Sequence, residues 1–129
     1  MQTYPIILTP DDPGYVVYIP DFDRNTEGYD LNEALMMAED AINMLGVAYE
    51  DDHIPVPAPS DYKTVLAQAG KDDIVTLISV DFDAYRRRTD NRSVKKNCTI
   101  PAWLNDKAMK AGINFSALLQ AAIKAELNL

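Results

Sequence analysis

Three polar side chains in the last third of the chain are spaced so that they could read a DNA sequence. Lys95, Asn97 and Thr99 alternate along the segment KKNCTI, and side chains two apart on a strand point to one face. A lysine can donate to guanine, an asparagine can bridge adenine, and a threonine offers a hydroxyl and a methyl group. A two-stranded ribbon with these residues on its outer face would fit the major groove of DNA.

The unit that carries these residues is too small to fold easily by itself. We expect a strand over Lys95 to Ile100, a helix that begins at Pro101 and stops at Gly112, and a second helix with Asn114 as its N-cap. Below about 40 residues, a disulfide, a metal or a second copy is usually needed. The whole chain has one cysteine and one histidine, so a second copy is the remaining route. We therefore expect two strands to pair across a two-fold axis.

Such a ribbon would turn Cys98 and Ile100 towards the helices and leave the DNA-reading face exposed. The backbone N–H groups at the start of the second helix, at Asn114, Phe115 and Ser116, would then be free to bind a DNA phosphate. The other interpretation is a helical hairpin that serves dimerisation alone.

The C-terminal segment resembles the ribbon-helix-helix family of repressors. The resemblance runs from Lys95 to about Leu127 and is carried by K-N-C-T-I-P followed by G-I-N-F-S-A-L-L. It implies a dimeric unit that binds operator DNA. Lys96 departs from the family, in which the first inward position of the strand is usually apolar, and its aliphatic stem would have to pack along the core.

Charge divides the chain at one boundary. Residues 1–84 contain 17 acidic and 3 basic residues, a net charge of −14, whereas residues 85–129 contain 3 acidic and 9 basic residues, a net charge of +6. An acidic surface attracts basic partners, and a basic segment attracts nucleic acid. Alternatively, both are solvated faces without partners. We expect a first domain over 1–84, a linker over 85–93 and a second domain over 94–129.

The first domain is expected to be an α+β layer, a small sheet with a helix packed on it. Pro5 has no backbone N–H, so we expect it at the start of its strand or on an edge. The expected elements are a hairpin of 4–8 and 15–19, a strand at 26–29, a helix at 31–49 with Asp30 as N-cap and Glu33 in a capping box, a short helix capped by Ser60, and a strand at 74–80.

With both domains considered, the chain resembles the HicB antitoxin family over nearly its whole length. The resemblance is carried, in order, by Y-P-I-I-L, D-D-P-G-Y-V-V-Y-I-P-D-F, T-E-G-Y-D-L-N-E-A-L-M-M-A, I-P-V-P-A-P-S and V-D-F-D-A-Y. It implies a partial RNase H-like fold for the first domain and binding of a HicA toxin, a small basic ribonuclease. Residues 23–25 depart from the family, in which many relatives carry a Gly-Cys pair.

The resemblance implies a type II antitoxin that covers the active site of its toxin and represses its own operon. Acidic side chains could occupy the toxin surface that otherwise receives RNA phosphates. Asp21, Asp23 and Glu27 are the candidates for toxin contact, although each could equally be ordinary turn chemistry. We expect a homodimer that can associate further into a tetramer through the first domains.

An alternative function is an RNase H-like, metal-dependent nuclease fused to a DNA-binding dimerisation module. Nucleases of that class cluster carboxylates around two metal ions. However, the first strand has no central carboxylate, and Glu39 and Asp40 would point about 100° apart on a helix. We therefore expect no enzyme activity, no metal and no cofactor. The carboxylates that this alternative would have to use are Asp21, Asp23, Glu39, Asp40, Asp81 and Asp83.

Composition excludes other classes of protein. Apolar residues make up 47% and charged residues 25% of the chain, which is typical of a folded domain rather than a disordered one. No run approaches the ~20 apolar residues of a membrane helix. The first ten residues, MQTYPIILTP, lack the basic and long apolar regions of a secretory signal. We expect a cytoplasmic protein that does not bind membranes.

Overall fold

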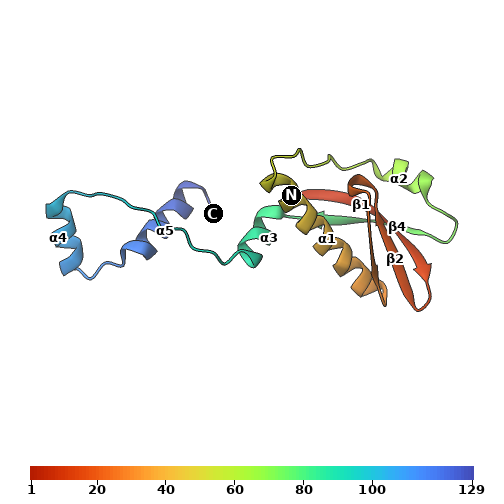
Figure 1. The fold of residues 1–129 in the computed structure, drawn as a ribbon, viewed down its shortest axis with the longest axis horizontal. Helices are drawn as coiled ribbons and strands as arrows, with labels where there is room; N and C mark the ends of the chain where they lie inside the picture. Colours follow the sequence, from red (N-terminus) through yellow and green to blue (C-terminus); the bar gives the residue numbers. More distant parts are fainter. The chain divides into compact units, whose positions relative to one another are not determined.

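A four-stranded antiparallel sheet forms the centre of the first of two units (Figure 1). The computed structural model describes all residues, Met1–Leu129, and the two units are Met1–Arg92 and Ser93–Leu129. The strands are β1 (Gln2–Asp11), β2 (Gly14–Ile19), β3 (Arg24–Gly28) and β4 (Ile74–Val80), in the order β3-β2-β1-β4. The predicted hairpin and last strand are confirmed, and the third strand begins two residues earlier than predicted.

Pro5 is placed differently from the prediction. It lies inside β1, the strand that pairs with both β2 and β4, rather than at a strand start or an edge. Pro5 is opposite Leu77 of β4, but the pairing with β2 begins only at Ile7, opposite Tyr18. The proline is tolerated because the chain is paired on one side only at that point.

Helix α1 (Leu31–Asp51) packs on the sheet through a stripe of mostly small residues. Ala34, Ala38, Ile42 and Gly46 recur every four residues and are buried, as expected for the core-facing side of an amphipathic helix. The core cluster joins them to alternating residues of the two central strands, which share one face of the sheet. These strand residues are Tyr4, Ile6, Leu8, Val17 and Ile19.

The start of α1 carries the predicted cap. The carboxylate of Asp30 accepts a hydrogen bond of 2.8 Å from the backbone N–H of Glu33. Glu33 reaches back as predicted, but its Oε1 accepts from the backbone N–H of Tyr29, at 3.3 Å, one residue before the cap. Two N–H groups at the helix start thus have acceptors.

A short helix, α2 (Tyr62–Gln68), contacts β1 and β4 and buries Val65. The prediction that Ser60 caps this helix is wrong, because its N-cap is Asp61, without a side-chain cap. Ser60 is instead held by Asp21, which lies in the 3-10 turn η1 (Pro20–Phe22). A long-range bond therefore replaces the local one that the sequence suggested.

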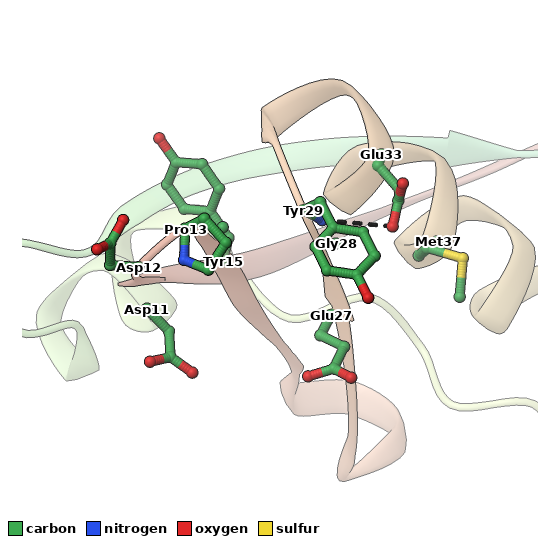
Figure 2. A pocket seen from close by; sticks show the side chains of 10 residues that line it. Asp11, Asp12, Pro13, Tyr15, Glu27, Gly28, Tyr29, Glu33 and Met37 are labelled. Atoms are coloured by element: carbon green, nitrogen blue, oxygen red, sulfur yellow. Dashed lines mark hydrogen bonds between the residues drawn. The ribbon is translucent and has the colours of Figure 1, made fainter.

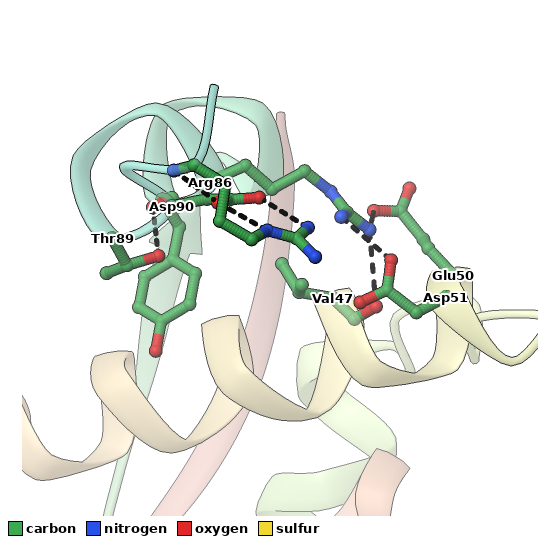
Figure 3. A network of polar contacts seen from close by, with 8 residues as sticks. Val47, Glu50, Asp51, Arg86, Thr89 and Asp90 are labelled. Atoms are coloured by element: carbon green, nitrogen blue, oxygen red, sulfur yellow. Dashed lines mark hydrogen bonds and ion pairs between the residues drawn. The ribbon is translucent and has the colours of Figure 1, made fainter. Parts of the chain in front are cut away.

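The predicted linker over residues 85–93 is wrong in its first half. Helix α3 (Phe82–Thr89) continues the first unit, with Asp81 as its N-cap. Arg86 fastens α3 to the C-terminal end of α1, as Figure 3 shows: it donates to Asp51 Oδ1 at 2.8 Å, to the carbonyl of Val47 at 3.2 Å and to Glu50 Oε1 at 3.3 Å. A cation is favourable at this end of a helix. The first unit therefore extends to Arg92.

The second unit consists of two helices, α4 (Ala102–Lys110) and α5 (Phe115–Glu126). Pro101 is the N-cap of α4 rather than its first residue, and Asn114 is the N-cap of α5 as predicted. The single chain has no strand at Lys95–Ile100, so the predicted pairing of two such strands stays a prediction. A ladder requires a second backbone, and this unit offers none.

None of the five α-helices combines the length and the apolar character needed to cross a membrane.

Gly28 provides a test of how β3 meets α1. A Cβ at Gly28 would overlap the backbone of α1 and would lie 2.7 Å from the Cα of Ala34. We expect Gly28→Ala to lower the free energy of unfolding by about 3 kcal/mol, because backbone cannot move aside without shifting the helix. Urea unfolding measures this change.

Gly70→Ala is the matched control. The nearest atom to its Cβ would be a carboxylate oxygen of Asp73 at 3.1 Å, which belongs to a side chain that can adjust. We expect a loss of less than about 1 kcal/mol there. Equal losses at the two glycines would contradict the close contact between β3 and α1.

Candidate functional site

A groove of about 300 Å³ on the first unit is lined by carboxylates, aromatic rings and a methionine (Figure 2). The hairpin loop, the end of β3 and the first turns of α1 all contribute to it. Carboxylates suit a basic side chain, and the exposed ring of Tyr29 suits the apolar stem beside such a charge. The side chains that line the groove are those of Asp11, Asp12, Pro13, Tyr15, Glu27, Tyr29, Glu33 and Met37.

Strand register and two glycines bring these side chains together. Tyr15 of β2 lies opposite Gly28 of β3, so the hairpin loop ends beside the turn into α1. A Cβ at Gly14 would lie 2.8 Å from the Cα of Tyr29, so only glycine permits this approach. Asp30 then starts α1 immediately, and the helix carries Glu33 into the groove.

Of the three predicted toxin-contact residues, only Glu27 lines this groove. Asp21 accepts hydrogen bonds from the backbone N–H of Ser60, at 3.0 Å, and from its hydroxyl. Asp23 has a left-handed backbone, with φ of 48°, and accepts from the hydroxyl of Tyr18 at 2.9 Å. The structure therefore separates Asp21 and Asp23 from Glu27 and occupies both with bonds inside the chain.

Sequence reasoning missed Asp11, Asp12 and Glu33 as members of the site. The hairpin expected from 4–8 and 15–19 leaves Asp11 and Asp12 in its turn, and Glu33 is expected in the capping box of the helix. The one usable signal was the hairpin itself, because a central strand of a meander places its loop next to the end of the third strand. Glu33 keeps its capping role as well, since its Oε1 accepts from Tyr29.

The boundary found in the structure changes the charge of each unit. Residues 1–92 contain 18 acidic and 7 basic residues, a net −11, and residues 93–129 contain 2 acidic and 5 basic residues, a net +3. The difference from the sequence division is the segment 85–92, which carries four arginines and one aspartate and belongs to the acidic unit. The two units still carry opposite net charges.

The carboxylates of the nuclease alternative do not form a metal site. No group of three or more His, Cys, Asp or Glu side chains is placed to hold a metal ion. Asp81 accepts from the backbone N–H of Ala84 at 3.1 Å, which is its role as the cap of α3. Glu39 and Asp40 are exposed on α1.

The second unit has an apolar groove of about 510 Å³ between its extended segment and α5. Lys96, Cys98 and Ile100 line it, whereas Lys95, Asn97 and Thr99 do not. Residues of the extended segment therefore alternate between groove and outer side, as in a strand. The helical residues that line the groove are Asn105, Phe115, Ser116, Leu118, Leu119 and Ala122.

This apolar side is uncovered in the single chain. Ala108 is the only buried residue of the unit, and Leu118 and Ile123 expose 57% and 48% of their surface. Cys98 was predicted to lie in the core but is exposed, because nothing in the chain closes the groove over it. An exposed apolar surface of this kind is typical of an interaction site.

The start of α5 leaves backbone donors free. Asn114 Oδ1 accepts from the backbone N–H of Ala117 at 3.0 Å. The N–H groups of Phe115 and Ser116 have no acceptor within the chain. Free N–H groups at a helix start favour an anion.

The chain also matches a known family of proteins. A family model described as the HicB-like antitoxin of bacterial toxin–antitoxin systems matches residues 4–122. The chain belongs to the HicB-like antitoxin family. The resemblance found in the sequence is thereby confirmed.

Three known proteins are similar to this chain in sequence or in fold. An uncharacterized 14.9 kDa protein from the rep-hol intergenic region of Haemophilus phage HP1 is 32% identical over 104 residues, which cover 78% of this chain and 74% of that protein. A toxin–antitoxin complex from Streptococcus pneumoniae contains a chain that is 26% identical, with a TM-score of 0.59 and coverage of 96% and 97%. The antitoxin HicB of Burkholderia pseudomallei shares the fold, at 22% identity and a TM-score of 0.58, with coverage of 99% and 98%.

The pair formed by Tyr18 and Asp23 gives a prediction that a pH titration can test. The hydrogen bond to Asp23, followed by burial and the charge of that carboxylate, raises the pKa of Tyr18 above its ordinary value of 10.0. Asp23→Asn removes the charge and weakens the acceptor, so we expect the pKa of Tyr18 to fall towards 10.0. Tyrosine ring carbon shifts followed by NMR measure it.

Glu27→Gln is the control for this titration, because Glu27 is not bonded to Tyr18 and lines the acidic groove, away from the bond between Tyr18 and Asp23. We expect the pKa of Tyr18 to be the same as in the unmodified chain. If Asp23→Asn left this pKa unchanged, the bond between Tyr18 and Asp23 would not exist in solution.

Proposed function

We propose that this HicB-like antitoxin neutralises a HicA-type toxin, a small basic ribonuclease, by covering its active site with the first unit, and that its second unit represses its own operon. The observation that carries the proposal is the carboxylate-lined groove on a unit of net charge −11, in a chain of this family. The first unit would be a partial RNase H-like fold and the second a ribbon-helix-helix fold. The action is occlusion and DNA binding in the cytoplasm, without enzyme turnover.

The acidic groove is the part of the first unit best suited to a toxin whose own surface binds RNA. Glu27 lines this groove together with Asp11 beside the hairpin loop and Glu33 at the start of α1 (Figure 2). Basic residues that bind phosphates would pair equally well with these carboxylates. Two similar structures are described as toxin–antitoxin complexes, one from Streptococcus pneumoniae and one of HicA3 with HicB3.

Asp21 and Asp23 have structural roles that make them weaker candidates than Glu27. Their carboxylates hold Ser60 and Tyr18 respectively. Breaking either bond to pair with a toxin would cost the bond that already exists. We infer that they shape the loop beside β3 rather than supply the main charges for the toxin.

Charge reversal at Glu27 tests the toxin surface. We expect Glu27→Lys to weaken binding of a catalytically inactive cognate toxin roughly tenfold or more, about 1.4 kcal/mol, because a like charge then faces the basic partner. Calorimetric titration of the full-length chain measures it, and relief of growth arrest by co-expression provides a second readout.

Glu39→Lys is the matched control, since Glu39 is exposed on α1 and does not line the groove. It makes the same change in net charge. We expect less than a threefold effect from this more distant charge at moderate salt. Equal weakening by the two variants would mean that only the overall charge matters and would argue against the groove.

The alternation of the extended segment supports DNA reading by the second unit. If two copies paired their segments as antiparallel strands, Cys98 and Ile100 would close over the apolar groove. Lys95, Asn97 and Thr99 would then lie together on the outer face of the ribbon, where they could contact base edges. The aliphatic stem of Lys96, which lines the groove, would pack beside the helices.

The start of α5 supplies the phosphate contact in this proposal. The N–H groups of Phe115 and Ser116 are free, and Asn114 holds the first turn in shape through its bond to Ala117. Such contacts position a protein on DNA without reading its sequence. The outer ribbon residues would supply the sequence preference.

Replacement of Asn97 tests base reading. We expect Asn97→Ala to lose about 1–3 kcal/mol of discrimination between operator DNA and a scrambled duplex, while affinity for the scrambled duplex changes little. Fluorescence anisotropy at one fixed salt concentration measures both affinities.

Asn91→Ala is the control, because Asn91 is an exposed asparagine of the first unit, outside the ribbon segment. It should leave the discrimination intact. Unchanged discrimination in Asn97→Ala would show that this ribbon face does not read bases and would favour a hairpin that serves dimerisation alone.

A further inference from the structure

The end of the first unit, at α3 and the residues after it, carries a cluster of arginines although the unit as a whole is acidic. Four of the seven basic residues in 1–92 lie within seven consecutive positions, and the other three are spread along the chain before them. This end of the unit is therefore positive where the rest is negative. The four clustered residues are Arg86, Arg87, Arg88 and Arg92.

Two of these arginines are paired with carboxylates inside the chain. Arg86 donates to Asp51 and Glu50 at the end of α1 (Figure 3). Arg92 donates to Asp90 Oδ2 at 2.9 Å, and its hydrogen bonds lower the pKa of the Asp90 carboxyl to about 2. These two arginines therefore already have anionic partners.

Arg87 and Arg88 have no such partner. Both side chains are exposed, and neither forms an ion pair within the chain. The guanidinium of Arg88 lies over the ring of Tyr85, 5.5 Å from its centroid, which restricts its position without neutralising its charge. Asp83 lies one turn before Arg87 but forms no ion pair with it. Two positive charges of α3 are therefore available to a negative partner.

Helix geometry turns these two arginines away from α1. Phe82 and Arg86 are four residues apart on one side of α3, and both contact α1: the ring of Phe82 packs against Gly46, and Arg86 binds the end of the helix. At 100° per residue, Arg87 and Arg88 each lie about 100° or more around α3 from these two residues. One side of α3 therefore holds the helix in place, and the other side presents its unpaired cations.

We propose that Arg87 and Arg88 bind phosphates of double-stranded DNA, an inference that rests on the operator binding proposed above for the second unit. A guanidinium group binds phosphate oxygens through paired hydrogen bonds. Contacts of this kind add affinity and fix the position of a protein on DNA, but they read no bases. The first unit would thus add to the affinity for DNA and leave the choice of sequence to the second unit.

The short connection after α3 keeps this helix close to any DNA that the second unit binds. Six residues lead from Thr89, the last residue of α3, to Lys95. An extended chain covers about 3.4 Å per residue, so this connection spans at most about 20 Å. A unit of net charge −11 that is tethered so near to DNA is repelled by the phosphates. Unpaired arginines on the helix next to the connection would offset part of this repulsion.

The positive charge of this surface argues against the toxin as its partner. A small basic ribonuclease would be repelled at α3 and attracted at the acidic groove. A polyanion is the partner of opposite charge, and the basic run continues from α3 into the segment proposed to read DNA. Residues 85–96 contain six basic residues and one acidic residue, a net charge of +5. This continuity favours DNA as the polyanion.

The salt dependence of DNA binding tests the proposal. The logarithm of the affinity falls with the logarithm of the salt concentration, with a slope of about −0.9 for each phosphate contact. We expect Arg87→Gln/Arg88→Gln to make this slope shallower by about 2 for each bound chain, and to weaken binding roughly tenfold or more at about 0.1 M salt. Operator and scrambled duplex should be affected alike. Fluorescence anisotropy of the full-length chain over a salt series measures both quantities, and circular dichroism verifies the fold.

Two double variants serve as controls. Lys63→Gln/Lys71→Gln removes the same number of positive charges at exposed positions of the first unit outside α3, and we expect it to leave the slope unchanged. Arg87→Lys/Arg88→Lys keeps both charges, so the slope should stay close to that of the unmodified chain. Equal changes of slope in the two glutamine variants would mean that only the net charge matters, and would overturn the proposal.

The remaining outcomes separate this proposal from the function proposed above. An unchanged slope in Arg87→Gln/Arg88→Gln overturns the phosphate contact and leaves base reading to be decided by Asn97→Ala. If Asn97→Ala keeps its discrimination while the arginine variant changes the slope, the ribbon fails and the phosphate contact stands. If the arginine variant weakens binding of a double-stranded RNA but not of DNA, α3 binds RNA and the proposal is wrong. No binding of any duplex by the unmodified chain would overturn both.

Discussion

The first unit depends on the close packing of α1 against the sheet and against α3. Small residues along one side of the helix make this possible: the backbone at Ala34 touches Gly28 of β3, and Gly46 accepts the ring of Phe82. At its N-terminal end the helix brings Glu33 into the acidic groove, and at its C-terminal end Glu50 and Asp51 hold Arg86. The same helix thus contributes to the candidate toxin surface at one end and binds α3, the last helix of the first unit, at the other.

The second unit differs from the first because it has no buried core within one chain. Ala108 alone is buried, and apolar side chains of α5 line an open groove. If the proposed pairing of two copies completes this unit, its folding is linked to protein concentration. The HicB-like chain therefore combines an acidic unit that has its own core with a basic unit whose apolar groove is open. The two kinds of surface suit two kinds of partner.

Local signals predicted the elements well, and contacts between distant residues explain the differences. The hairpin, α1 and the cap by Asp30 follow from alternation, helical periodicity and capping chemistry, all of which act within a few residues. Asp21 was expected to be free for a partner, but it binds Ser60, 39 residues away. Arg86 was expected in a linker, but its three acceptors lie on α1, up to 39 residues earlier. No local pattern contains such pairings.

The amino-acid sequence by itself determined the family, the order of the elements from β1 to β4 and the alternation of Lys95, Asn97 and Thr99 with Cys98 and Ile100, because these depend on residue types at fixed spacings. Only the tertiary structure decided that Glu27 shares a groove with Asp11 and Glu33 while Asp21 and Asp23 do not, and that β4 lies beside β1 at an edge of the sheet. The physical reason is that strand order, register and helix docking are set by packing among residues far apart in the chain. Such contacts contribute free energy only in the folded chain, where those distant residues are in contact.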